Sequence, residues 1–219
     1  MKKTLFIIGF VCSSILGSAQ KDSSFFEIGL NVFPVIRNYN SAESDITLNP
    51  YALQLEKSFG KFGLRVGAGY RSIENTEEPS DFNGQNTFVQ DTSTMDLRFG
   101  VVLYKNFNEK WSIKYGVDAI VANRSSNSNT IFVNANNIRH ETTNNTESSG
   151  FGVAPFIFAQ YHFSKNFSIG TEMSFRYLNN EIATVRENTE FPEFNAEINR
   201  TKTEVELLFP TALFVIVRF

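Results

Sequence analysis

The chain of 219 residues has very little of several residue types: one cysteine, one tryptophan and two histidines. Cys12 lies in an amino-terminal segment that we interpret below as a cleaved leader, so the mature chain should form no disulfide and use no thiolate. After residue 20 there is no run of about 18 apolar residues, which excludes a helical membrane span in that part. The formal net charge of −3 gives no basic footprint, so we expect no nucleic acid partner.

The amino terminus has the pattern of a secretory signal peptide. Two lysines precede an apolar stretch from Leu5 to Leu16, and small residues up to Ala19 follow it. A short apolar core between a basic start and small residues is typical of a segment that is removed on export. We therefore predict a signal peptide over 1–19 and one exported domain over 20–219.

Alternation of apolar and polar residues with a period of two runs through most of the remaining chain. In the segment from Phe62 to Tyr70, every second side chain is apolar, and the residues between them are glycine or arginine. This period is typical of strands with two different faces. The chain is therefore predicted to be all-β. The eight predicted strands are 25–37, 48–59, 62–74, 92–105, 111–123, 151–163, 167–178 and 201–219.

Short and long connections alternate strictly between the predicted strands. The short ones have the composition of tight hairpin turns, and they are 60–61, 108–110 and 164–166. The long ones are polar, and they are 38–47, 75–91, 124–149 and 179–200. This alternation predicts an antiparallel up-and-down sheet with every short turn at one end. The apolar residues 131–133 suggest that the fifth strand continues into a hairpin beyond the others.

The alternation alone does not say which face points inward. A soluble lipocalin-like barrel would bury the apolar face, whereas a membrane barrel would bury the polar one. The membrane is favoured by aromatic residues on both sides of each short turn, and by apolar faces with almost no charge over the roughly 9–11 residues that a tilted strand needs. Pro34, Pro155 and Pro210 each lie nine residues from a short-turn end, so we expect them at the outer interface.

The carboxy-terminal residues carry a resemblance to a known family. Leu213, Val215, Val217 and Phe219 occupy every second position up to the last residue. Together with the signal peptide and the eight alternating strands, this resembles the small eight-stranded outer-membrane β-barrel proteins of Gram-negative bacteria, the outer membrane protein beta-barrel domain family. The resemblance covers 20–219. It implies an all-β, antiparallel up-and-down transmembrane β-barrel in the cell outer membrane, surrounded by outer-membrane lipids and lipopolysaccharide. It also implies that these four residues form a signal read by the outer-membrane assembly machinery.

The inward face of such a barrel would be polar and would carry charges of both signs. An eight-stranded barrel is just wide enough for side chains to fill it, and buried charges need partners. We predict a salt-bridge network that plugs the lumen; a narrow polar conduit or a binding pocket is the alternative. Phe156, Phe158, Phe214 and Ile216 share this face and suggest an apolar lower plug, or else a small cavity for a hydrophobic ligand. The charged residues of the predicted network are Glu27, Glu56, Arg65, Arg71, Asp96, Arg98, Lys114, Asp118, Glu172, Arg176, Glu204 and Glu206.

The sequence predicts no catalytic residue, cofactor or metal site. His140 falls in a long connection and His162 beside a short turn, and neither has the nucleophile or paired acids that enzymatic barrels need. The long connections are mostly acidic. Their charge could simply keep them solvated, or it could bind divalent cations or a basic or glycan partner. None of them has the residue spacing of a calcium loop. We expect a non-enzymatic surface barrel with an unknown extracellular partner or a role in envelope integrity. The alternative is a narrow channel or carrier for small hydrophobic or polar solutes.

Overall fold

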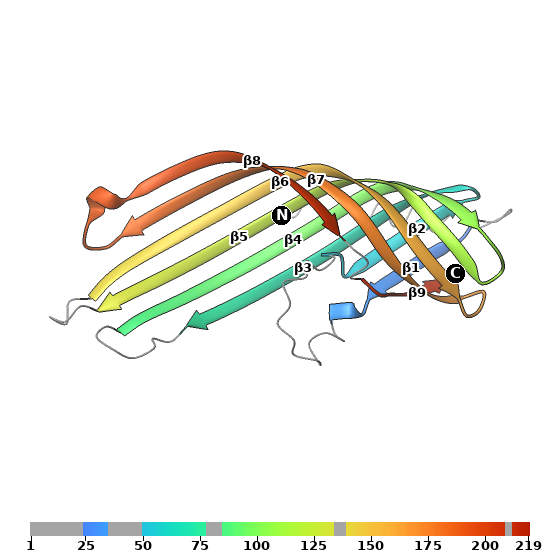
Figure 1. Ribbon diagram of the computed structural model, residues 1–219, viewed down its shortest axis with the longest axis horizontal. Helices are drawn as coiled ribbons and strands as arrows, with labels where there is room; N and C mark the ends of the chain where they lie inside the picture. The colour runs from blue at the N-terminus through green and yellow to red at the C-terminus, as the bar shows by residue number, and fades with distance from the viewer. Residues whose placement is uncertain (1–23, 35–49, 78–84, 134–138, 209–211) are drawn as a thin grey trace, which may run out of the picture.

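The computed structural model describes residues 24–34, 50–77, 85–133, 139–208 and 212–219. The predicted signal peptide and the connection 38–47 lie outside these ranges. Most of the described residues are in strands (Figure 1), and no helix among them is long and apolar enough to cross a membrane. The elements are β1 (Phe26–Asn31), β2 (Leu53–Phe59), β3 (Phe62–Glu77), β4 (Gln85–Asn106), β5 (Trp111–Val133), β6 (Arg139–His162), β7 (Phe167–Asn188), the 3-10 helix η1 (Pro192–Phe194), β8 (Ala196–Leu208) and β9 (Phe214–Arg218).

The strands form one antiparallel sheet that closes on itself. Each strand from β1 to β7 pairs with the next along the chain, and β9 closes the ring by pairing with both β1 and β7. At the seam between β1 and β9, Glu27 opposes Arg218. Phe26 and Phe219 exchange two backbone hydrogen bonds there, of 3.1 and 2.8 Å. The predicted antiparallel up-and-down β-barrel is therefore confirmed.

The last predicted strand, 201–219, consists of two strands in the structure. β8 pairs with the upper part of β7, where Leu208 opposes Ser174, and β9 pairs with its lower part, where Phe214 opposes Gly170. Four residues along β7 therefore correspond to six along the closing strand, so the register shifts by two. Pro210 falls in this interval, outside the described residues; a proline there provides no amide for the ladder.

The three predicted short turns are confirmed, and they lie at one end of the barrel. Gly60 has a φ of 83°, a left-handed conformation that suits a residue without a Cβ. In the other two turns, the side chains of Asn108 and Ser164 accept hydrogen bonds from the backbone amides two and three residues later. These local bonds hold the chain in a tight reversal between neighbouring strands.

At the opposite end, the strands run far beyond their predicted limits. Most of 75–91, 124–149 and 179–200, which we predicted as polar loops, is strand. The β5–β6 hairpin keeps one register from Trp111 to Val133, which confirms the predicted continuation of the fifth strand. The loop prediction was wrong because a sheet with water on both faces shows no apolar alternation, even where Thr, Val and Ile retain their preference for strands.

The apolar side chains of the closed part point outward. On β5 the outward side chains are apolar from Trp111 to Val121 and polar from Asn123 to Asn129. On β7 they are apolar, apart from one threonine, from Phe167 to Tyr177. Each of these stretches has the length of a strand that crosses hydrocarbon, roughly 9–11 residues. Exposed aromatic residues near the short turns are Phe59, Phe62, Phe107, Trp111, Phe163, Phe167 and Phe219.

Pro155 does not lie where we expected it. It is opposite Val117 on the outward face of β6, inside the apolar stretch and not at its outer end. The pairing of β6 with β7 skips Ala154 and Pro155, because proline has no backbone donor. The expectation that three prolines mark one level at the outer interface is therefore wrong for Pro155, and Pro34 lies just after β1 has ended.

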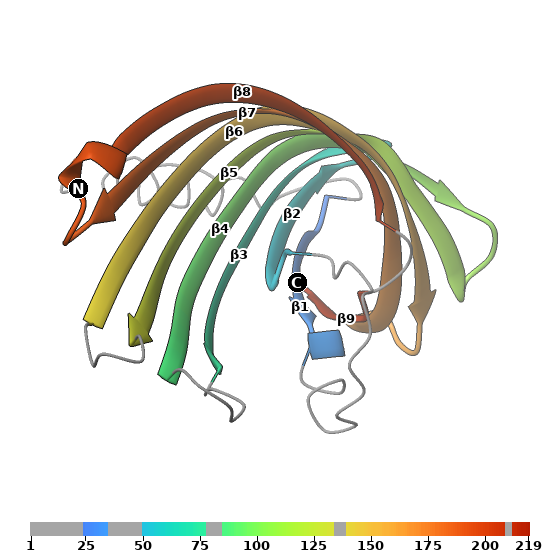
Figure 2. The same ribbon diagram turned by 60° about the vertical axis from the view of Figure 1, so that its left-hand side comes forward.

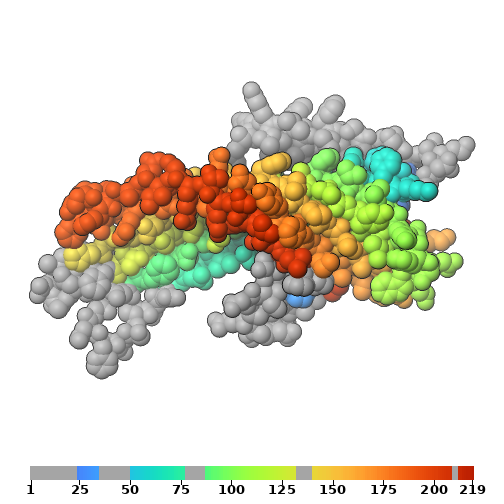
Figure 3. Space-filling view, turned by 45° about the horizontal axis from the view of Figure 1, so that its top comes forward, coloured from blue at the N-terminus to red at the C-terminus, as the bar shows by residue number. Residues whose placement is uncertain are grey.

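Beyond the closed part, the wall that the described residues form consists of β3 to β8. Among the described residues, β3 from Gly69 onward pairs only with β4, and β8 pairs only with β7. Figure 2 shows these strands as one curved wall, and Figure 3 shows it projecting from the closed part of the molecule. We call this wall the trough. It consists of 69–77, 85–96, 122–133, 139–150, 180–188 and 196–202.

Candidate functional site

Charged side chains from nearly every strand meet inside the closed part of the barrel. Strand alternation points them inward, because their neighbours along each strand carry the outward apolar side chains. Most of the predicted network is buried; Glu204 and Glu206 are half-buried, and Arg71 is exposed. The buried members are Glu27, Glu56, Arg65, Asp96, Arg98, Lys114, Asp118, Glu172 and Arg176.

At the centre of the lumen, two arginines face two carboxylates. Arg65 binds Asp118 through Nε, at 2.8 Å, and through Nη2, and it donates from Nη1 to Glu172 at 2.8 Å. Arg98 donates to the same Glu172 at 2.5 Å and lies 3.6 Å from Asp118. The guanidinium of Arg65 also covers the ring of Phe156, 3.0 Å from its centroid. These contacts join β3, β4, β5, β6 and β7 across the lumen.

A second cluster lies nearer the short turns and includes the seam. Lys114 contacts Glu27 and donates to Glu56 at 2.7 Å. Arg218 binds Glu27 at 2.6 Å, and the hydroxyl of Tyr104 donates to Glu56 at 2.9 Å. We did not predict Arg218 as part of the network, although it follows the inward Phe214 and Ile216 at the same period of two.

A third cluster lies on the far side of the central one from the short turns. Arg176 donates to Asp96 at 2.7 Å and lies 3.5 Å from Glu206. The ring of Tyr51 is buried beneath the guanidinium of Arg98. The Cζ atoms of Arg98 and Arg176 lie 4.0 and 6.0 Å from the centroid of this ring. Tyr51 was absent from the predicted network because it precedes the first residue of β2, where strand alternation does not yet apply.

The predicted inward apolar residues meet in one cluster between these ion pairs. The rings of Phe158 and Phe214 lie 5.6 Å apart. Small residues make room for large ones: a Cβ added to Gly170 would lie 2.1 Å from the ring of Phe158, and one added to Gly100 would lie 1.9 Å from Oδ1 of Asp118. The cluster consists of Val102, Phe156, Phe158, Ala212, Phe214 and Ile216.

The two histidines lie at opposite ends of the barrel, so they cannot serve one site. His162 is beside a short turn, with its Nε2 2.8 Å from the hydroxyl of Ser112. His140 lies at the far end of the trough, where it contacts Glu190 and stacks on Phe191. Within the described ranges, no three His, Cys, Asp or Glu side chains gather as metal ligands would.

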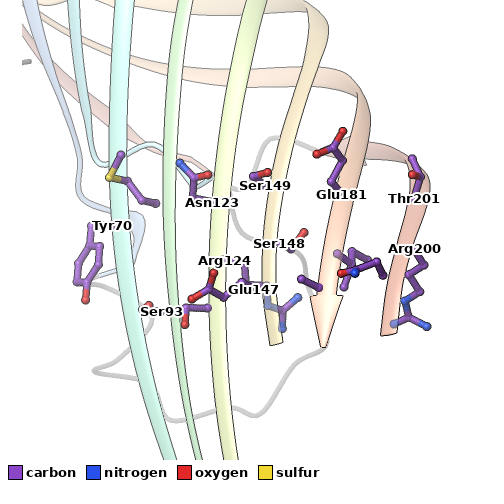
Figure 4. Close-up of a pocket in the computed structure, with 15 residues that line it drawn as sticks. Tyr70, Ser93, Asn123, Arg124, Glu147, Ser148, Ser149, Glu181, Arg200 and Thr201 are labelled. Atoms are coloured by element: carbon purple, nitrogen blue, oxygen red, sulfur yellow. The ribbon is translucent and has the colours of Figure 1, made fainter. Parts of the chain in front are cut away.

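Above these clusters, the lumen opens into a cavity of about 690 Å³ inside the trough. Tyr51, Asp96 and Arg176 lie at its floor, and its walls come from β3 to β8 together with Asn31, Pro34 and residues 50–52. A second groove, of about 670 Å³, crosses the same strands (Figure 4). Most of its lining side chains, such as Asn123 and Glu181, belong to the outward set just beyond the apolar stretch.

Comparison with known proteins gives distant structural neighbours only. No protein-family model and no curated protein matches the chain. A major outer membrane protein from Thermus thermophilus is 13% identical, with 90% of this chain and 100% of that chain covered at a TM-score of 0.38. CarO from Acinetobacter baumannii is 10% identical, with 89% and 94% covered at a TM-score of 0.39. The barrel fold of this chain is established by its own closure between β1 and β9.

Proposed function

We propose that this protein is a non-enzymatic outer-membrane β-barrel with a plugged lumen, and that it acts through the surface that the trough presents outside the cell. The observation that carries the proposal is the sharp limit of the apolar outward face. On β5 this face runs from Trp111 to Val121, with Val117 52% exposed, and polar side chains replace it from Asn123 to Asn129 on the same strand. An apolar surface of this extent around the whole barrel is suited to lipid and not to water.

The two ends of the barrel suggest its orientation. Membrane barrels of this kind have short turns in the periplasm and long connections outside. The turns at Gly60, Asn108 and Ser164 are short, whereas the opposite end carries the extended hairpins of β3 to β8. The trough would then project outward from the membrane surface, and the polar groove of Figure 4 would lie at the level of the lipid headgroups.

The buried ion pairs support a plug. Arg65 is buried between Asp118 on β5 and Glu172 on β7, so it bridges the lumen from one wall to the other. Buried charges are retained only where partners offset their desolvation, which favours a fixed structure over a mobile one. A narrow channel or carrier is the second candidate, and the cavity above Arg176 favours it, because it would serve as the vestibule.

Conductance in planar bilayers separates these two functions. The refolded wild-type protein should be silent, because the central ion pairs fill the lumen. The double variant Arg65→Ser, Glu172→Ser should show openings, whereas Arg71→Ser, which changes an exposed inward arginine on the same strand, should stay silent. Discrete openings of the wild-type protein would support the channel and contradict the plug.

Cell fractionation tests the location. We expect the protein in the outer-membrane fraction, with a folded band that shifts in electrophoresis only after heating. Outer-membrane lipids, lipopolysaccharide and the outer-membrane assembly machinery would be its partners during and after insertion. Recovery as a soluble periplasmic protein would contradict the proposal.

A further inference from the structure

The two faces of the trough carry opposite charges. Side chains alternate between the faces, so the register of β3 to β8 assigns each one. The concave face holds the cations Arg71, Arg124, Arg186, Arg200 and Lys202, with Glu204 and Glu206 just below them. The outward face holds the acids Glu74, Asp91, Glu141, Glu147, Glu181, Glu187 and Glu197. Among the outward side chains of 69–76, 87–96, 122–131, 140–150, 180–188 and 196–202, none is cationic.

Three of the concave cations lie in one row across the strands. The row follows the register pairs Arg71, Thr94, Arg124, Ser148, Ile182 and Arg200. At a strand spacing of about 4.8 Å, the first two arginines are roughly 10 Å apart and the last two roughly 14 Å apart along the wall. All three are exposed, and none has an ion pair with another described residue. We call these three residues the arginine row.

The arginine row lines the cavity above the plug, together with neutral hydrogen-bonding groups. Hydroxyls of Thr94, Ser126, Thr146 and Ser148 line the same cavity. Its acids, Asp96, Glu204 and Glu206, are paired with Arg176 or Lys202. At its floor, Arg176 is only 6% exposed, and its Nε has no hydrogen-bond partner among the described residues. The volume of about 690 Å³ suits a ligand of several rings. Spaced cations between hydroxyl groups match a ligand that has both anionic groups and many hydroxyls.

We propose that the concave face of the trough binds an acidic oligosaccharide, with its carboxylates on the arginine row. The planar fork of arginine binds a carboxylate through two parallel hydrogen bonds, which fixes position as well as charge. The inference rests on the proposed function, because the trough must face the outside of the cell. The acidic outward face repels the phosphates of the surrounding lipopolysaccharide, so the ligand arrives from the external solution.

Fluorescence anisotropy with labelled hexagalacturonate tests the proposal on the refolded full-length barrel in detergent. The wild-type protein should bind this probe, and added salt should weaken the binding because exposed charges are screened. The triple variant Arg71→Gln, Arg124→Gln, Arg200→Gln should bind at least about tenfold more weakly, because it loses three charge-assisted hydrogen-bonding groups. The matched control is Lys61→Gln, Lys110→Gln, Lys165→Gln, which removes the same charge at the exposed short turns and should bind as the wild type does.

Four results would overturn the proposal: no binding of hexagalacturonate, equal loss in both triple variants, equal binding of neutral maltohexaose, or binding of purified lipopolysaccharide without binding of hexagalacturonate. The last result would assign the arginine row to the phosphates of membrane lipid. Conductance and heat-dependent migration of the same preparations report on the barrel itself. A barrel that is folded and shows no conductance, but does not bind hexagalacturonate, would therefore contradict the proposed ligand and leave the proposed function unaffected.

Discussion

Replacement of Arg65 by methionine should destabilise the barrel more than any conservative change outside the lumen. The Arg65 side chain is fully buried and holds Asp118 and Glu172 together. Methionine retains most of the length and apolar surface of arginine, so the change removes the charge with little loss of volume. In Arg65→Met, Glu172 keeps Arg98 at 2.5 Å, but Asp118 keeps only the same Arg98 at 3.6 Å. One buried carboxylate is thus left without adequate compensation.

Removal of one partner from a buried ion pair costs about 3–5 kcal/mol, because the remaining charge stays desolvated. A domain is stable by only about 5–15 kcal/mol, so this loss is a large part of the total. Urea unfolding in detergent or lipid measures it. Trp111 is the only tryptophan and lies on the outward face beside a short turn, so its fluorescence reports on insertion.

Two further variants separate lost pairing from lost side-chain volume. Arg71→Met changes an inward arginine on the same strand that is exposed and has no ion pair among the described residues, so its effect should stay within about 0.5 kcal/mol. The double variant Arg65→Met, Asp118→Asn removes the uncompensated charge and should regain at least about 1 kcal/mol over Arg65→Met. A loss below about 1 kcal/mol in Arg65→Met, with the barrel still folded, would refute the buried network as a source of stability.

Three other changes test the apolar outward face, the packing of the lumen and the carboxy-terminal signal. Val117→Arg should destabilise the inserted barrel by roughly 2–4 kcal/mol, as measured by urea unfolding in lipid vesicles. Asn123→Arg changes an outward residue on the same strand beyond the apolar stretch, so it should have little effect. Equal effects of the two variants would mean that the apolar stretch does not lie in the lipid. Gly100→Ala should cost about 1–3 kcal/mol in the same assay, because the new Cβ would lie 1.9 Å from Oδ1 of Asp118; an unchanged midpoint would place Asp118 elsewhere. Phe219→Ala keeps the two backbone hydrogen bonds to Phe26, so the refolded barrel should keep its stability while its abundance in the outer membrane falls. Wild-type abundance would make Phe219 an interface residue without a role in assembly.

The sequence predicted the closed part of the barrel well because the information needed there is local. A period of two is visible within one strand, so the inward direction of Arg65 and Lys114 follows from their immediate neighbours. The turn at Gly60 is equally local. The pairing of side chains within the lumen is not local, because Arg65 contacts residues that are 53 and 107 positions away in the chain. Those meetings depend on the stagger of the whole barrel, which no single strand reveals.

The trough was missed for a related reason. Arg124 and Arg200 fall in stretches that we predicted as loops, because polar residues occupy both faces of the strand there. Only the register across six strands brings them level with Arg71. The opposite charges of the two faces likewise become visible only after each residue has been assigned to a side of a strand. The acidic composition of these stretches was correct as a total, but it concealed a basic inner surface.

The seam between β1 and β9 determines the order in which the barrel can form. Every hairpin from β2 to β7 grows from one connection and pairs residues no more than 50 positions apart. The seam joins Glu27 to Arg218 across 191 positions and has only five register pairs. Loop closure over such a separation is slow, and only a few strand pairs offset its entropic cost. Closure should therefore be the last step of folding, after the hairpins have formed a curved sheet with two open edges. Arg218 meets Glu27 only at that moment, so this ion pair and the ring of strands are completed together.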